Sequence, residues 1–215
     1  HVVIPHQNYD SLPNTSTKAQ ARKHLQISED AHVMLVFGNI NENEKELITK
    51  AFNFIPNKNK VLLAPKWKIK RRKIDYIRLR EWVWHLEKKI HKLDKKRRVD
   101  LGFIEEEDAH FYLNASDFLF IPRTNELNSG NITLGCTFGL VVVGKDDSDI
   151  GEILHATGNP TFKVGHNKSL KKAISLAYRL KKDGHGKKNK ELSSREWNID
   201  IVARAYVQEM RNLIS

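Results

Sequence analysis

Residues 117–135 read DFLFIPRTNELNSGNITLG, and this stretch decides the fold. An apolar run from Phe118 to Ile121 ends at Pro122, and a polar loop follows. The step Ser129-Gly130-Asn131 then begins a run of small and apolar residues with helical character. A strand that is apolar at every position is typical of a sheet covered on both faces. The stretch therefore predicts a strand, a loop and a helix of an α/β protein.

The same alternation of short apolar runs and helical patterns continues along the chain. The other apolar runs are 33–37, 61–64, 98–101 and 140–143, and helical patterns begin near Glu42, Lys70, Glu105, Asn131 and Asp149. Two more helices are expected near 169–182 and 195–213, with an exposed loop at 184–188 between them. Alternating strands and helices predict a Rossmann-like α/β domain, with a parallel sheet, right-handed crossovers and helices on both faces.

Composition narrows the protein class. We expect one domain over residues 1–215, with a leading segment and first helix over about 1–30 and a C-terminal helix over about 191–215. The sequence contains no run of about 18 apolar residues, so no membrane-spanning helix is expected. Cys136 is the single cysteine, which excludes an internal disulfide and suits the cytoplasm. We interpret it as a buried structural thiol rather than a nucleophile.

The positive charge is concentrated in one segment. Residues 66–98 contain 15 Lys and Arg against 4 Asp and Glu, a surplus equal to the whole net charge of +11. Apolar residues within it follow helical spacing, at Tyr76, Leu79, Val83, Leu86, Ile90 and Leu93. The pattern predicts a helix that packs this stripe on the sheet. Its basic face is either solvated or in contact with an anionic membrane, and nucleic acid is disfavoured because no recognition motif accompanies the charge.

Ligands of such a sheet bind outside the carboxyl ends of the strands, so the residues directly after each strand are site candidates. Among these, Ser129-Gly130-Asn131 opens a helix after a buried strand. A glycine lets the backbone approach a ligand closely, and free N–H groups at a helix start favour an anion, for which a diphosphate is the natural occupant. The alternative is an ordinary helix cap without a ligand.

A series of short motifs, in order, resembles the C-terminal, donor-binding domain of GT-B-fold glycosyltransferases, in particular glycosyltransferase family 4. The resemblance covers nearly the whole chain. The motifs are Ile4-Pro5-His6, Ala21-Arg22, Leu35-Val36-Phe37-Gly38, Lys45 with Ala51-Phe52, Gly102-Phe103-Ile104, Asn114-Ala115-Ser116-Asp117, the Ser129-Gly130 step, Gly139 to Val143, Gly151-Glu152-Ile153-Leu154 and Ser194 to Trp197.

The resemblance implies a sugar-nucleotide donor, no cofactor and no metal, with retention of anomeric configuration. By position, Lys45 resembles the lysine of a basic pair that clamps the diphosphate, and Glu126 resembles the first glutamate of a Glu-x7-Glu motif. These two are the catalytic candidates. The lysine suits the role because a cation offsets the charge on the leaving nucleoside diphosphate. The candidate substrate-binding residues are Gly38, Asn39, Phe103, Ile104, Arg123, Asn128, Ser129, Gly130, Asn131 and Ile132.

The resemblance further implies a separate N-terminal domain that holds a glycan or lipid-linked acceptor. We expect that domain to lie outside this chain, and the chain alone to be inactive in transfer. The implied setting is bacterial polysaccharide biosynthesis in the cytoplasm, with peripheral contact at the inner face of the membrane through residues 66–98. His6 either faces the cleft between the two domains or is an ordinary surface residue.

Two positions depart from the family pattern. The arginine expected after Gly38 is Asn39, and the second glutamate of the motif falls on Leu134. The rival interpretation is therefore a non-catalytic domain that binds a nucleotide or a partner, and a lesser one is an epimerase or another GT-B-fold enzyme. Asp147-Ser148-Asp149 spells the Asp-x-Asp pattern of metal-dependent transferases, but we interpret it as a helix start, as we do Glu105 to Asp108.

Overall fold

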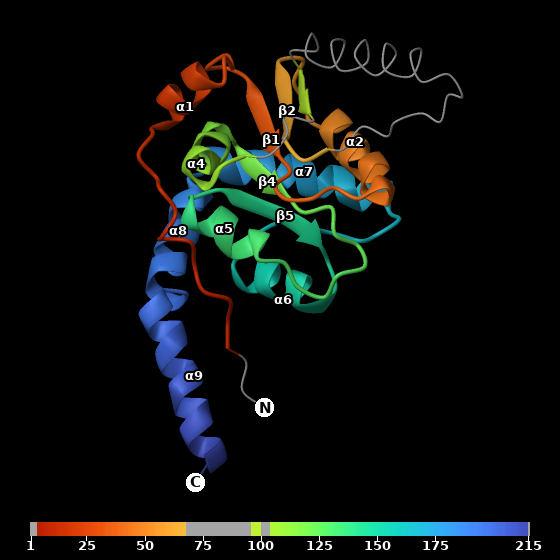
Figure 1. Cartoon of the computed structure of the whole chain (residues 1–215). Coiled ribbons are helices and arrows are strands. Elements are labelled where there is room, and N and C mark those ends of the chain that lie inside the picture. Colours follow the sequence, from red (N-terminus) through yellow and green to blue (C-terminus); the bar gives the residue numbers. More distant parts are fainter. Residues whose placement is uncertain (1–3, 68–95, 100–103, 215) are drawn as a thin grey trace, which may run out of the picture.

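A parallel β-sheet forms the centre of the protein (Figure 1). The computed structural model describes residues 4–67, 96–99 and 104–214. Within these residues the sheet has six strands in the order β3-β2-β1-β4-β5-β6, and every neighbouring pair is parallel. The strands are β1 (His32–Leu35), β2 (Lys60–Ala64), β3 (Arg97–Val99), β4 (Phe118–Phe120), β5 (Val141–Lys145) and β6 (Thr161–Phe162). The predicted Rossmann-like α/β class is confirmed.

Helices cover both faces of the sheet. One core cluster contains side chains of α1 (Lys18–His24), α4 (Glu106–Ala115), α5 (Asn131–Thr137) and α6 (Ser148–Ala156), with α8 (His185–Glu196) packed beside them. The other cluster contains side chains of α2 (Lys45–Asn53), which follows a short turn η1 (Glu42–Glu44), and of α7 (Asn167–Lys182). The last helix, α9 (Ile199–Ile214), projects away from the sheet (Figure 1). No described helix is both long and apolar enough to span a membrane.

The strands are apolar throughout because successive side chains enter different cores. In β1, Val33 and Leu35 belong to the cluster under α1, α4 and α5, whereas Met34 belongs to the cluster under α2 and α7. All three side chains are fully buried. Since side chains alternate across a strand, a strand buried on both faces loses the alternating pattern of a half-exposed one.

A buried carboxylate fastens the helices to the amino-terminal edge of the sheet. Asp117 accepts a hydrogen bond from the Val33 N–H at 2.8 Å and pairs with Lys18 of α1 at 2.5 Å. Arg22 of α1 and Lys181 of α7 also pair with it, at 3.2 and 3.1 Å. Burial alone would raise the pKa of this carboxyl, but Lys18 and the other partners lower it. In open parallel sheets, ligands bind at the opposite edge, outside the carboxyl ends of the strands. The network around Asp117 therefore has a structural role.

The predicted loop at residues 184–188 is wrong. Gly184, with φ +75°, lies two residues after the end of α7 at Lys182, and α8 begins directly after it at His185. Gly186 is a packing glycine inside α8, because a Cβ there would lie 1.9 Å from the carbonyl oxygen of Gly139. The predicted last helix is divided at Trp197 and Asn198 into α8 and α9. Strand β6, which has two residues, was not predicted, and the helix predicted near Lys70 lies outside the described residues.

Candidate functional site

The order in which strands are added to the sheet reverses between β1 and β4. From β1 the chain adds strands on one side through β2, and on the other side through β4. In open parallel sheets, the crevice outside the carboxyl ends of two such strands is the usual ligand site. Here the segments that follow the two strands are Phe37 to Asn39 after β1 and Pro122 to Asn131 after β4, and we call the space between them the crevice. Most of the predicted site residues lie in these two segments.

Two hydrogen bonds join the segments. The Asn131 side-chain N–H donates to the carbonyl oxygen of Phe37 at 2.8 Å, and Arg123 Nη2 donates to the carbonyl oxygen of Asn39 at 2.6 Å. Between these two carbonyls lies Gly38, with φ +94°, a conformation that side chains rarely allow. A Cβ built on Gly38 would point toward Asn131 and Arg123, at 3.9 and 4.0 Å. The structure therefore brings Gly38, Asn39, Arg123 and Asn131 together.

Arg123 is the best-anchored cation of this crevice. Its Nη1 lies 2.7 Å from a carboxylate oxygen of Glu44, which is 4% exposed, and its Nε lies 3.5 Å from Glu126. Glu126 is 52% exposed, so its carboxylate also meets solvent. Within the described part of the chain, the hydrogen bonds to Glu44 and Asn39 use two of the five guanidinium N–H donors. The remaining donors can serve a ligand.

Lys45 is the first residue of α2, and most of its side chain is shielded from solvent. Its side chain is 15% exposed, and its Nζ pairs with Glu42 at 3.0 Å. The same ammonium lies 5.5 Å from the ring centre of Trp67, which bridges to Ile40 beyond the end of β1. A phosphate at Lys45 would therefore compete with Glu42, whose side chain is 56% exposed.

The Ser129-Gly130-Asn131 step does begin helix α5, with Gly130 as the N-cap and no side-chain cap. The space beside the Gly130 Cα is already taken, because a Cβ there would lie 2.8 Å from the Tyr9 hydroxyl. Packing against Tyr9 thus accounts for this glycine without a ligand. Asn128 is exposed and Ser129 half-buried, whereas the Ile132 side chain is buried in the core, so only its backbone is available to a ligand.

The remaining predicted positions have separate outcomes. Ile104 is half-buried just before α4, and Phe103 lies outside the described residues. Leu134, at the position of the second glutamate of the family motif, is 4% exposed and belongs to the hydrophobic core. A leucine there supplies no ribose acceptor, and the core around it suits the leucine.

The structure adds two side chains from the leading segment to the rim of the crevice. His6 and Tyr9 stack with ring centres 5.6 Å apart, and both lie next to Gly130. The sequence left the place of His6 open and gave no reason to single out Tyr9. Their proximity to α5 depends on a contact between residues more than a hundred positions apart, which no local pattern encodes.

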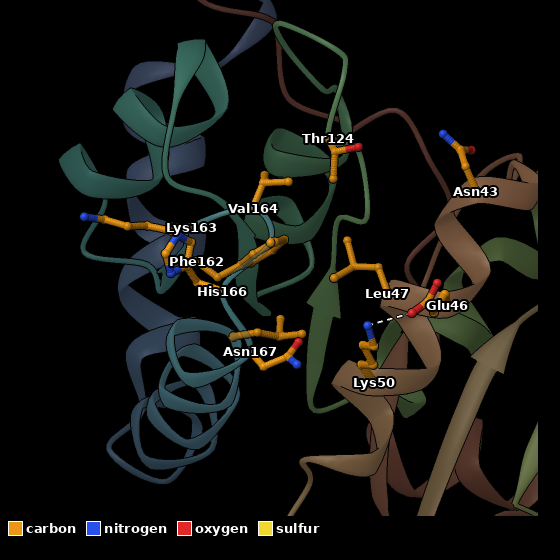
Figure 2. A pocket seen from close by; sticks show the side chains of 12 residues that line it. Asn43, Glu46, Leu47, Lys50, Thr124, Phe162, Lys163, Val164, His166 and Asn167 are labelled. Atoms are coloured by element: carbon orange, nitrogen blue, oxygen red, sulfur yellow. Dashed lines mark ion pairs between the residues drawn. The ribbon is translucent and has the colours of Figure 1, made fainter.

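A cavity of about 240 Å³ lies beside the crevice on the side of α2 and α7 (Figure 2). Its walls come from α2, from Thr124 in the loop after β4, and from residues 162–170. Leu47, Phe162 and Leu170 are apolar, and Asn43, Lys50 and His166 supply polar groups. None of the predicted site residues lines it, although Thr124 directly follows Arg123 in sequence.

Two other candidates from the sequence have structural explanations. Helix α6 begins at Ser148, as expected, and Asp147 pairs with Lys145 at 2.7 Å instead of capping the helix. Cys136 is fully buried, and burial raises the pKa of its thiol to about 12. Such a thiol stays protonated at neutral pH and is not a nucleophile.

Comparison with known proteins gives structural matches only. No family model matches the chain, and no curated protein sequence does. Sucrose-phosphate synthase from Thermosynechococcus elongatus is 21% identical with a TM-score of 0.68, over 98% of this chain and 52% of that one. HepE from Anabaena, solved with UDP and glucose, is 14% identical with a TM-score of 0.65, over 93% and 53%. This chain thus spans about half the length of either protein.

A third similar structure is itself a single domain, and nearly all of it is matched by this chain. It is the C-terminal domain of a glycosyl transferase group 1 family protein, LpcC, from Francisella tularensis, with 13% identity and a TM-score of 0.59 over 87% of this chain and 96% of that one. The half-length matches to the longer chains agree with this correspondence. The protein therefore has the fold of the C-terminal, Rossmann-like half of a GT-B glycosyltransferase.

Proposed function

We propose that this domain binds the nucleoside diphosphate of a sugar nucleotide in the crevice between β1 and β4. In this proposal it is the donor half of a metal-independent, retaining glycosyltransferase that acts on a glycan or lipid-linked acceptor. The observation that carries the proposal is the pair of hydrogen bonds from Asn131 and Arg123 to the backbone on either side of Gly38. They fix the turn at Gly38, where the backbone carries no side chain, at the point of the sheet where such ligands bind.

The roles follow from the chemistry of each group. Arg123 stands against Asn39, so its guanidinium supplies the charge that an arginine at position 39 would bring. Together with Lys45 it would stabilise the diphosphate as it departs with negative charge. In this proposal the carboxylate of Glu126, which lies next to Arg123 and is half exposed, contacts the donor sugar. Asn128, Ser129 and Ile104 complete the proposed contacts, with the base near Ile104.

The charges around the crevice are nearly balanced. Lys45 is paired with Glu42, and Arg123 lies between Glu44 and Glu126. A diphosphate would therefore gain little from long-range attraction and would depend on close hydrogen bonds. We expect a dissociation constant on the order of 0.1–1 mM for this domain alone, because a single domain covers only part of the donor.

Titration calorimetry with UDP, GDP and ADP in EDTA tests the proposal. Lys45→Met should weaken binding about tenfold, since it removes a charged hydrogen bond. Its matched control is Lys50→Met, which removes another ion-paired lysine from α2 that is outside the crevice. Glu126→Gln should leave binding equal or tighter, because it removes a negative charge next to Arg123. Absence of binding, or binding only with Mn²⁺, would refute the proposed site.

Transfer separates the proposed role from its rivals. A purified domain that only holds the donor should transfer no sugar to any acceptor, and sugar transfer by this chain alone would contradict the two-domain interpretation. Nucleotide binding without transfer even in the presence of an acceptor-binding domain would favour the non-catalytic alternative, for which Asn39 and Leu134 are the motive.

A further inference from the structure

The leading segment is fixed across helices α5 and α8 by backbone hydrogen bonds. The Asn8 N–H donates to the carbonyl oxygen of Trp197 at 2.7 Å, and the Tyr9 N–H donates to Thr137 Oγ1 at 3.1 Å. The side chain of Asn8 is buried and donates to the Ser193 carbonyl. Residues 8 and 9 therefore have a defined position, and the exposed His6 is placed two residues before them.

The orientation of the His6 ring is also defined. Its ring stacks on Tyr9, with 18° between the planes, and its Nδ1 lies 2.7 Å from the carbonyl oxygen of Gln7. A carbonyl only accepts, so Nδ1 carries the hydrogen in both the neutral and the charged ring. Thr133 Oγ1, at 3.4 Å, is the other polar group near Nδ1. The nitrogen left for an external partner is Nε2.

Nε2 lies next to the start of helix α5, in the segment that follows β4. It lies 3.5 Å from the Cβ position of Gly130, and the next residue, Asn131, bonds to Phe37 at the end of β1. The ring lies next to Tyr9, Gln7, Thr133 and Gly130, and Tyr9 is the titratable group of these four. Burial raises the pKa of Tyr9, so it stays neutral. None of these four groups therefore carries a charge.

We propose that His6 binds the donor through Nε2, as an imidazolium that donates a hydrogen bond to an oxygen of the diphosphate. This inference rests on the proposed function. Because the Gln7 carbonyl keeps Nδ1 protonated, the ring takes up one proton at Nε2 when the ligand binds, and no tautomer change is needed. His6 thereby adds the cation that the nearly balanced charges of the crevice lack.

Side-chain replacements distinguish a contact through Nε2 from a structural role. Glutamine extends its amide to the place of Nε2, whereas asparagine reaches only the place of Nδ1. We expect His6→Asn to weaken UDP-glucose binding about tenfold and His6→Gln to weaken it less, because glutamine keeps a donor at the place of Nε2 but loses the charge. Gln7→Ala is the matched control, because it removes an exposed side chain but keeps the carbonyl that orients the ring. Equal losses in His6→Asn and His6→Gln would overturn the inference.

Ring nitrogen chemical shifts give a readout that stability alone does not move. With ¹⁵N-histidine labelling, saturating UDP-glucose should move His6 Nε2 to the shift of a protonated nitrogen, and the His6→Gln variant assigns the signal. An unchanged ring, in a sample whose Gly38 and Asn131 amides shift, would refute the role of His6 and leave the donor site intact. If no amide shifts at all, the proposed function itself fails.

Discussion

Tyr9 of the leading segment contacts Gly130 at the start of α5, and a Cβ on Gly130 would have to displace the Tyr9 hydroxyl. Gly130 has right-handed helical backbone angles, so its conformation alone would accept alanine. The hydroxyl of Tyr9 is what excludes a Cβ, at 2.8 Å. A glycine that looks like a ligand-binding feature in the sequence is thus also a packing requirement, and the two explanations lead to different experiments.

A double-mutant cycle separates them. Gly130→Ala should destabilise the protein by about 1 kcal/mol, because the new methyl group displaces the Tyr9 ring. In a Tyr9→Phe background the same change should be neutral or stabilising by about 0.4–1 kcal/mol, since alanine reduces the entropy of the unfolded chain. Urea unfolding of the four proteins measures this. Equal destabilisation in both backgrounds would show that the hydroxyl is not the obstacle.

His32 provides a pH-dependent contribution at the other edge of the sheet. Burial against Tyr178 lowers its pKa to about 4, from an ordinary value near 6.5. The unfolded chain therefore binds a proton that the folded protein resists, and stability should fall as the pH drops from 6.5 toward 4.

The measurement compares urea unfolding at pH 6.5 and 4.5. His32→Phe keeps a ring against Tyr178 and should reduce the loss of stability between these pH values by on the order of 1 kcal/mol, a figure discounted for the partial exposure of the ring. His166→Phe is the control, because it makes the same replacement at an exposed histidine. An unchanged slope in His32→Phe would contradict the assignment.

At the scale of elements, the strands could be predicted from sequence and the end of the chain could not. Val33 to Leu35, Phe118 to Phe120 and Val141 to Val143 are apolar at every position because both faces of the sheet are covered. Strand β6 has only two residues and carries no periodic signal. Gly184 and Gly186 are two residues apart and resemble a loop, yet one directly precedes α8 and the other packs inside it.

The contact between α8 and the turn after α5 gives a direct test of that assignment. A Cβ on Gly186 would lie 1.9 Å from the Gly139 carbonyl oxygen, so Gly186→Ala must push α8 outward. We expect a loss of about 1–3 kcal/mol in the free energy of unfolding. Lys187→Ala, at a side chain that is 84% exposed, should change it by less than about 0.5 kcal/mol. A neutral Gly186→Ala would show that residues 184–188 form a loop after all.

The candidate site could be predicted only in part, because some of its contacts join segments that are far apart in the sequence. Gly38, Arg123 and Asn131 follow the two strands at the switch point, and the order of the strands is enough to expect them together. The hydrogen bond of Arg123 to Asn39, and the place of His6, depend on tertiary contacts between distant segments. Leu134 shows the opposite case, where the sequence identified a departure from the family pattern and the core explains it.

At the scale of the whole molecule, the basic segment 66–98 contains the entire net charge of the chain, and most of it lies outside the described residues. If its basic side chains face an anionic bilayer together, each near the surface contributes about 1 kcal/mol, and screening limits the reach to about 8 Å at physiological salt. Sedimentation with anionic vesicles should then exceed that with neutral vesicles, decrease with salt, and drop in Lys88→Glu/Lys89→Glu. Equal, weak binding in every condition would support the solvated interpretation.

If a nucleoside diphosphate occupies the crevice between β1 and β4, titration with UDP in EDTA should shift the amide signals of the residues around it. We expect saturable shifts that centre on Gly38, Asn39 and residues 129–131, without added metal. Shifts centred on the cavity at residues 162–167, or on the edge around His32 and Asp117, would contradict it. A spectrum that stays unchanged at about 10 mM UDP, ten times the largest dissociation constant expected, would also contradict it.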